Sequence, residues 1–203
     1  KLAYERAASL LSRDFFGGGK RQEILDLVLY LISYTYPFIV VSAAFGVGKT
    51  TFSRQLAKLA PESNCKAVSL DGRALSASPR FSLDIARAIG VSEDWLSDIE
   101  ETQSLEIEKI ILEFAEQSAY KGEAIILCID DADLLTLDRL GALLRWVGTS
   151  HEQQLKVILL GDFTASDLFD HEVVAERFAA LGHWVTLDPF DEKDSEHFLR
   201  FLL

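Results

Sequence analysis

The sequence has no methionine and starts at Lys1, so we expect it to be a segment of a longer protein. It has only two cysteines, Cys65 and Cys128, and each lies in an apolar run. Neither belongs to a C-x-x-C pair or to a histidine cluster. The pattern therefore predicts reduced thiols in the core rather than a metal site.

Positive charge is also scarce. The chain has 20 Lys and Arg residues against 32 Asp and Glu residues, which gives a net charge of -12. No dense basic run interrupts this excess, so nonspecific attraction to the phosphates of nucleic acid is opposed. We therefore expect no nucleic acid partner for this domain, and we interpret most of the acidic surface as solubilising.

Long apolar runs are missing as well. The longest, at residues 24–32, is interrupted by Asp26 and is shorter than the roughly 20 residues that a membrane-spanning helix needs. No signal peptide pattern is present. We expect a cytoplasmic domain, and anchoring of the parent protein in an inner membrane stays open.

The 203 residues, of which 49% are apolar, are enough to bury one sizeable core. We therefore expect a single domain over residues 1–203. Within it, residues 1–36 form a helical lead-in, residues 37–190 form the core, and residues 191–203 begin a further helical region.

Strand and helix patterns alternate along the core. Strands are predicted at residues 38–42, 66–70, 124–129, 157–160 and 184–187. Helices are predicted at residues 3–14, 20–35, 50–59, 81–89, 105–120, 137–147 and 173–180, and from residue 192 onward. Three of the strands are nearly continuous apolar runs, which is typical of strands covered by helices on both faces. The pattern predicts an α/β fold, a three-layer α/β/α sandwich with a five-stranded, mainly parallel sheet.

The segment between the first core strand and its helix has the composition of a phosphate-binding loop (P-loop). Glycines permit the turn, and the backbone N–H groups of the loop and helix point at the anion. Lys49 would reach the β and γ phosphates, and the hydroxyl of Thr50 would bind magnesium. Ala43 stands where the full motif has a glycine. The residues expected to bind the nucleotide are Ala44, Phe45, Gly46, Val47, Gly48, Lys49, Thr50 and Thr51.

Two adjacent carboxylates end the strand at residues 124–129. Asp130 is predicted to hold the magnesium together with Thr50, and Asp131 to orient or deprotonate the attacking water. The alternative is a pair of helix-capping aspartates, with Asp133 as the better cap. A GTPase would need an N-K-x-D motif, but the only asparagine is Asn64, so we expect ATP and Mg²⁺ as the ligands.

Two further polar residues follow later strands. Asp162 comes after the strand at residues 157–160 and is a candidate for sensing the γ phosphate or holding the water; a turn aspartate that caps the next helix is the alternative. Arg177 precedes the last strand and is a candidate arginine finger, a cation supplied to a neighbouring subunit. A solvated arginine on a helix face is the alternative.

These motifs together resemble the ExeA/GspA-type AAA+ ATPases, which include secretion ATPases and the MshM-like and DamX-like ATPase domains. The resemblance spans residues 15–190 and includes Phe-Phe-Gly before an amphipathic helix, Gly-x-Gly-Lys-Thr-Thr, Ile-Asp-Asp-Ala-Asp and Leu-Leu-Gly-Asp. It implies that residues 15–21 lie near the adenine and that Arg177 belongs to the arginine-finger region. The sequence departs from the family at Ala43, at Asp131, where a glutamate is usual, and after Leu203, where the small helical lid would follow.

The resemblance implies an ATP-hydrolysing AAA+ switch for a membrane- or envelope-associated machine of the secretion, pilus or cell-division type, with nucleotide-dependent self-association. Two alternatives stay open. One is a nucleotide-binding scaffold with little hydrolysis, which the shorter side chain of Asp131 favours. The other is a DNA-associated AAA+ protein of the initiator or transposition-helper type.

Overall fold

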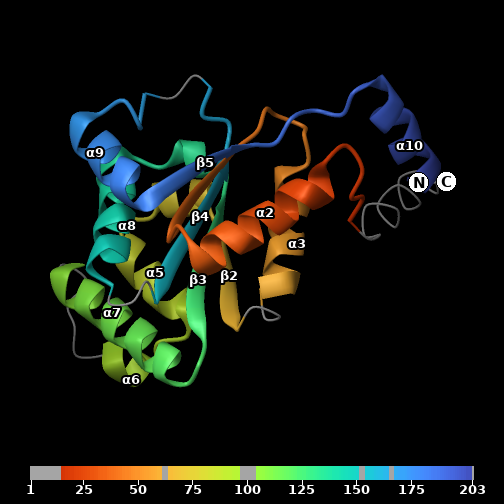
Figure 1. Ribbon diagram of the computed structural model, residues 1–203. Coiled ribbons are helices and arrows are strands. Elements are labelled where there is room, and N and C mark those ends of the chain that lie inside the picture. The colour runs from red at the N-terminus through yellow and green to blue at the C-terminus, as the bar shows by residue number, and fades with distance from the viewer. Residues whose placement is uncertain (1–14, 61–63, 97–103, 151–153, 165–166, 203) are drawn as a thin grey trace, which may run out of the picture.

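The protein is described by a computed structural model over residues 15–60, 64–96, 104–150, 154–164 and 167–202. The helix predicted at residues 3–14 lies outside the described residues. Figure 1 shows a sheet between two layers of helices, with one further helix standing apart from the sheet.

The sheet has five strands in the order β2-β3-β4-β1-β5, and every neighbouring pair is parallel. The predicted five-stranded parallel sheet is therefore confirmed. Its strands are β1 (Phe38–Ser42), β2 (Cys65–Asp71), β3 (Ala124–Asp130), β4 (Leu155–Gly161) and β5 (Gly182–Thr186).

The predicted helices are present with small shifts in their bounds: α2 (Arg21–Tyr34), α3 (Lys49–Leu59), α5 (Phe81–Ile89), α7 (Ser104–Tyr120), α8 (Leu137–Thr149), α9 (Glu172–Leu181) and α10 (Glu192–Leu202). Three short elements were not predicted: α4 (Gly72–Ala77), α6 (Glu93–Leu96) and the 3-10 helix η2 (Ala132–Leu134). Each is too short to show a helical period in the sequence.

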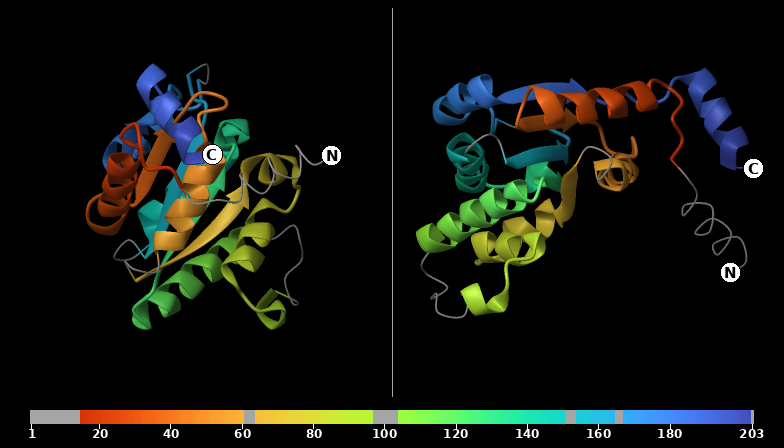
Figure 2. Two further views of the ribbon diagram at one scale, coloured as in Figure 1. Left: turned by 90° about the vertical axis from the view of Figure 1, so that its right-hand side faces the viewer. Right: turned by 60° about the horizontal axis from the view of Figure 1, so that its bottom comes forward.

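Alternation along the strands sends side chains to two separate cores. On β1, Ile39 and Val41 pack with residues of α2 and α3, whereas Phe38 and Val40 pack with residues of α5, α7 and α8. The two views in Figure 2 show these helices on opposite faces of the sheet. The central strands are buried on both sides, which explains their continuous apolar sequence.

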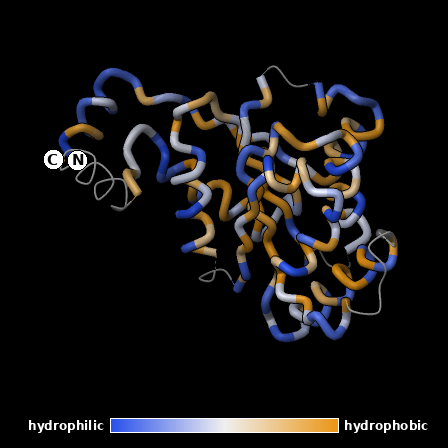
Figure 3. Tube along the Cα trace, turned by 180° about the vertical axis from the view of Figure 1, so that it is seen from behind, coloured by the Kyte–Doolittle hydropathy of each residue, from blue (hydrophilic) through white to orange (hydrophobic). Residues whose placement is uncertain are grey.

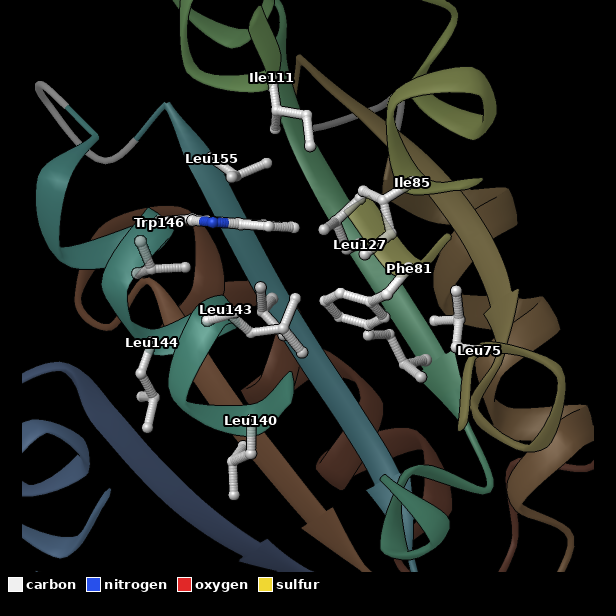
Figure 4. Packing of buried hydrophobic residues seen from close by; sticks show 14 of the residues in the cluster. Leu75, Phe81, Ile85, Ile111, Leu127, Leu140, Leu143, Leu144, Trp146 and Leu155 are labelled. Carbon is white, nitrogen blue, oxygen red and sulfur yellow. The ribbon is translucent and has the colours of Figure 1, made fainter. Parts of the chain in front are cut away.

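The larger core lies under α5, α7 and α8 (Figure 4). Trp146 is 1% exposed, and its ring lies 5.7 Å from that of Phe81 at 30°. Large side chains from α8 thus pack against Phe81 and the central strands in one core.

The smaller core holds α2 against the sheet. Leu25, Val28 and Ile32 are almost fully buried, at the spacing of an amphipathic helix. Nζ of Lys156, on β4, donates hydrogen bonds to the carbonyl oxygens of Ile32 (2.7 Å) and Ser33 (3.2 Å). This buried lysine therefore satisfies acceptors in the last turn of α2, where the helix itself offers no donors.

Both cysteines are free and buried, as the sequence predicts. Burial raises the pKa of the Cys128 thiol to about 12 and also raises the pKa of Cys65. Both side chains are therefore protonated core thiols at neutral pH.

Helix α10 extends away from the sheet and lies near the segment that precedes α2 (Figure 3). It is predominantly polar, but its aromatic residues turn toward Phe16, whose ring lies 5.5 Å from that of Phe198 and 5.3 Å from that of Phe201. Among the described residues, no helix combines the length and the apolar character needed to cross a bilayer.

Candidate active site

Two glycines shape the loop between β1 and α3. Gly46 and Gly48 have φ angles of 81° and 97°, in the left-handed region that other residues disfavour. A Cβ atom at either position would meet nothing within 4 Å, so the backbone conformation, not space, requires glycine. Helix α3 then begins at Lys49, and its first N–H groups have no acceptors within the helix. The loop and helix together have the form of an anion-binding site.

The side chain of Lys49 curls back over this loop. Its Nζ donates hydrogen bonds to the carbonyl oxygens of Ala43 (3.0 Å) and Ala44 (3.1 Å). Ala43 is 3% exposed, and its N–H donates to the carbonyl of Gly161 at 2.9 Å. The alanine that departs from the usual motif is therefore accommodated as a core residue where β1 ends.

Thr50 and Asp130 meet at the carboxyl edge of the sheet. Oγ1 of Thr50 donates a hydrogen bond of 2.5 Å to Oδ2 of Asp130. Both are hard oxygen donors of the type that magnesium prefers, and they border a cavity of about 410 Å³ that Asp71 and Asp131 also line. Among the described residues, no three His, Cys, Asp or Glu side chains are placed so that they could hold a metal ion by themselves, so a magnesium ion here would need oxygens from the nucleotide and water. The donors fit such an ion.

The backbone of Asp131, the residue after Asp130, is strained. Its φ of 51° is uncommon for a residue other than glycine, and such strain tends to occur at functional sites. Its Oδ2 lies 4.0 Å from Nη2 of Arg73, and the two side chains are 47% and 75% exposed. A pair this exposed holds the carboxylate only weakly. Asp131 precedes η2, but its side chain makes no capping hydrogen bond, so the capping alternative does not describe it.

Gly72 is a site residue that the sequence analysis missed. It starts α4 directly after β2, beside the two carboxylates. A Cβ atom here would lie 2.7 Å from the carbonyl oxygen of Asp130 and 2.5 Å from that of Asp131. Backbone cannot move as a flexible side chain can, so this position needs glycine to keep the acidic turn in place. The glycine after a strand was the only signal in the sequence.

Asp133 does not cap a helix, contrary to the alternative raised from the sequence. Its Oδ1 accepts a hydrogen bond of 3.1 Å from the backbone N–H of Asp162. The neighbouring Gly161 leaves room for this contact, because a Cβ there would come within 2.6 Å of the same oxygen. Asp133 therefore joins the ends of β3 and β4.

Asp162 lies beside the phosphate loop. Hydrogen bonds from the hydroxyl (2.6 Å) and the N–H (3.3 Å) of Thr164 reach its Oδ1. These bonds, with smaller effects from the charge of Lys49 and the N–H of Phe45, hold the pKa of the Asp162 carboxyl below its ordinary value. The side chain accepts hydrogen bonds within its own turn, as expected for a turn aspartate. It does not cap the next helix, because α9 begins at Glu172. Its charge faces the loop, where it can hold a water molecule but would repel a bare phosphate.

Arg177 is not brought to this edge. It is an exposed residue within α9, the helix that the sequence predicts at residues 173–180. Helix α9 packs on α8 and β5, on the face of the sheet opposite α3 (Figure 1). Arg177 therefore lines neither of the cavities that border the phosphate loop and the acidic turn.

A second cavity, of about 420 Å³, opens beside the phosphate loop, and we call it the aromatic pocket. Phe15, Phe16 and Arg21 line it, and they belong to the segment for which the resemblance implies a place near the adenine. Its remaining lining residues are Phe45, Gly46, Val47, Gly48, Thr51, Pro189, Phe190, Ser195, Phe198, Phe201 and Leu202.

The far wall of the aromatic pocket comes from the C-terminal part of the chain and was not predicted. The ring of Phe16 lies 5.5 Å from that of Phe190, and Phe190 lies 5.4 Å from Phe198. Aromatic faces of this kind suit the stacking of a planar base. The signal was the group of phenylalanines on and before α10, in a region interpreted only as the start of a helix.

A larger cavity, of about 520 Å³, lies along α8 between α5 and α9. Its polar side chains include Arg80, Arg139, Arg145 and His171, and one of these, Arg145, pairs with Glu108 at 3.3 Å. None of its lining residues belongs to the phosphate loop or to the acidic motifs. The arrangement of chemical groups therefore identifies the carboxyl edge, not the cavity along α8, as the candidate site.

Comparisons with known proteins agree with this geometry. A family profile described as "AAA domain" matches residues 32–169, from the end of α2 to the segment before α9. A comparison with curated protein sequences finds no match.

Several solved structures share the fold. Cdc6p from Pyrobaculum aerophilum is 16% identical with a TM-score of 0.68, covering 96% of this chain and 52% of its own. ORC2 of Aeropyrum pernix is 14% identical with a TM-score of 0.61, covering 94% and 53%. AMPPCP-bound DnaA from Aquifex aeolicus is 14% identical with a TM-score of 0.56, covering 95% and 53%. The chain thus spans about half the length of these proteins, and at such identities the likeness shows the fold alone.

Replacing Lys49 tests the phosphate loop. We expect Lys49→Ala to abolish measurable ATP binding, a loss on the order of 100-fold or more, because it removes the cation from the loop without touching the core. Calorimetric titration with ATP and Mg²⁺ measures the affinity. Lys58→Ala, on the exposed last turn of the same helix, is the matched control and should bind like the wild type. Unchanged affinity in Lys49→Ala would contradict the assignment of the loop.

Proposed function

The chain belongs to the AAA domain family, whose members are ATPases, and we propose that it acts as an ATP-driven switch. ATP binds with Mg²⁺ at the carboxyl edge of the sheet and is hydrolysed there to ADP and phosphate. The resulting change passes to a partner through the surfaces around the site.

The observation that carries this proposal is the meeting of Thr50 with Asp130 beside the phosphate loop. Residues that bind phosphate and residues that favour a metal lie within one site, as phosphoryl transfer requires. Bound magnesium would neutralise charge on the β and γ phosphates. Asp131 follows Asp130 directly in the chain, and its carboxylate, which the exposed pair with Arg73 holds only weakly, would accept a proton from water.

The two aspartates have different roles in this proposal, so replacing each of them should affect a different quantity. We expect Asp131→Asn to keep ATP bound while turnover falls on the order of 10²–10⁴-fold, the usual share of general-base catalysis. Asp130→Asn should instead weaken the Mg²⁺-dependent part of ATP binding. Steady-state hydrolysis and calorimetric titration with and without Mg²⁺, on the intact protein, measure the two effects.

Asp138→Asn is the matched control, because Asp138 is an exposed carboxylate in the first turn of α8. It should leave both quantities unchanged. If the wild type hydrolyses ATP no faster than Asp131→Asn, the switch proposal fails and the alternative of a nucleotide-binding scaffold is correct.

Self-association is the second part of the proposal. Arg177 is exposed on α9, on the other face of the sheet from its own phosphate loop. We propose that it completes the site of a neighbouring copy, stabilising charge that develops during phosphoryl transfer. The chain would then assemble head to tail in a manner that depends on the nucleotide.

Mixing two inactive variants tests this arrangement. Arg177→Ala retains a complete phosphate loop, and Lys49→Ala retains the arginine. We expect turnover in the mixture to exceed that of either variant alone, because one copy can supply what the other lacks. A mixture of Lys49→Ala with Asp131→Asn is the control. Both variants retain Arg177 and each is defective in its own ATP site, so we expect turnover in this mixture to be no higher than that of the two variants alone. Absence of complementation in the first mixture would contradict the role of Arg177.

The partner of the switch is a membrane- or envelope-associated machine in our leading hypothesis. Its support is the motif resemblance to the ExeA/GspA type. A DNA-associated role is the second candidate, because solved structures of this fold include a DNA replication initiation factor and ORC bound to DNA. Against it stands the net charge of -12.

A paired binding assay distinguishes the two candidates. The intact protein is incubated with ATP and Mg²⁺ and then tested for an electrophoretic shift of duplex DNA at moderate salt and for flotation with inner-membrane vesicles. We expect flotation and no DNA shift. A DNA shift that persists at moderate salt, without flotation, would replace the membrane hypothesis with the initiator type.

A further inference from the structure

Arg21, the first residue of α2, lies where three segments of the chain meet. Only 5% of its surface is exposed. Its Nη2 donates a hydrogen bond of 2.7 Å to the carbonyl oxygen of Val47 in the phosphate loop. Its Nη1 donates a longer bond of 3.4 Å to the carbonyl oxygen of Asp188, which follows β5. One guanidinium therefore joins the start of α2, the loop and the segment that leads to α10.

The same guanidinium contacts the wall of the aromatic pocket. Its Cζ lies 3.9 Å from the centre of the Phe190 ring, within the range of a cation–π interaction. Burial lowers the pKa of the Arg21 guanidinium, whereas the charge of Asp194 on α10 acts in the opposite direction. The preceding Gly19 approaches the same elements, since a Cβ there would lie 2.8 Å from a carboxylate oxygen of Asp194 and from the Phe190 ring.

The contact with Val47 fixes the orientation of one peptide group. A trans peptide is planar, so its C=O and N–H point in opposite directions. The carbonyl of Val47 and the N–H of Gly48 belong to the same peptide group. Because Arg21 holds the carbonyl, the N–H of Gly48 points away from Arg21. Gly46 and Gly48 have positive φ angles, which is typical of loops whose N–H groups surround an anion.

A buried cation also makes the three segments depend on one another. If the loop moves, the guanidinium loses its acceptor at Val47 while it remains out of water, and such an unpaired charge is costly. Arg21 can follow the loop only by changing its contacts with Asp188 and Phe190. Movement of the loop and the position of α10 are therefore coupled.

We propose that Arg21 is a positioning residue that orients the Gly48 N–H toward the phosphates and transmits occupancy of the site to α10. This inference rests on the proposed binding of ATP. It gives the switch a defined output, in which the packing of helix α10 against the aromatic pocket becomes more stable when nucleotide is bound.

Arg21→Lys is the test, because lysine keeps the charge but cannot bridge two carbonyl oxygens and stack on a ring. We expect the affinity for ATP with Mg²⁺ to fall on the order of 10- to 100-fold, and the affinity for pyrophosphate with Mg²⁺, which has no base, to fall to a similar extent. Calorimetric titration measures both. Lys58→Gln, which removes an exposed cation from the last turn of α3, is the control and should match the wild type.

Hydrogen exchange of the peptide that covers α10 provides the second readout. In the wild type we expect ATP to slow exchange in α10, and in Arg21→Lys we expect this protection to be lost even at saturating ATP. If pyrophosphate binding is unchanged in the variant, Arg21 does not position the loop. If α10 gains the same protection in both proteins, Arg21 does not transmit occupancy. Either result overturns the inference.

A measurement on the wild type covers the case in which the variant fails to fold. The guanidinium NMR signals of Arg21 should be slow to exchange in the free protein and should shift on addition of ATP. Signals that do not respond to ATP would overturn the inference. If the wild type binds neither ATP nor pyrophosphate, the proposed function itself fails, and that outcome is distinct from all of the above.

Discussion

The hydrogen bond from Thr50 Oγ1 to Asp130 Oδ2 is the contact on which the site depends. It joins the first turn of α3 to the end of β3, although β4 lies between β1 and β3 in the sheet. Only strands that run parallel and end at one edge allow this meeting. The two buried cores on either side of the sheet provide that alignment. Packing of the two cores therefore fixes the position of the Thr50 hydroxyl relative to the Asp130 carboxylate.

Much of this arrangement could be predicted from the sequence, because its signals are local. The predicted bounds of β1 agree with the structure, and β3 extends the prediction by one residue, since buried strands read as continuous apolar runs. The phosphate loop could be located because its glycines and lysine are contiguous. The last strand was placed less well: β5 spans Gly182–Thr186 rather than residues 184–187, because it is a partly exposed edge strand with a weak pattern.

What the sequence could not reveal depends on contacts between distant residues. The bond from the Asp162 N–H to Asp133 crosses 29 positions, and that from Arg21 to Asp188 crosses 167. No local pattern distinguishes Asp133 from a helix cap or Arg21 from a solvated arginine. Gly72 is required only because β2 lies beside β3, which brings it against the acidic turn. The order of the strands in the sheet therefore determines which of the separate motifs lie together in one site.

The central claim is that ATP and a divalent ion bind together at the carboxyl edge of the sheet, between the phosphate loop and the two aspartates. Replacing Mg²⁺ by paramagnetic Mn²⁺ in the presence of ATP and recording the amide NMR spectrum tests this directly, because the ion broadens only nearby resonances. We predict that the amide resonances of Gly48, Thr50, Gly72 and Asp131 are broadened and that the resonance of Arg177 is not broadened in the monomer. Broadening centred instead on the cavity along α8, or no ATP-dependent broadening at all, would contradict it.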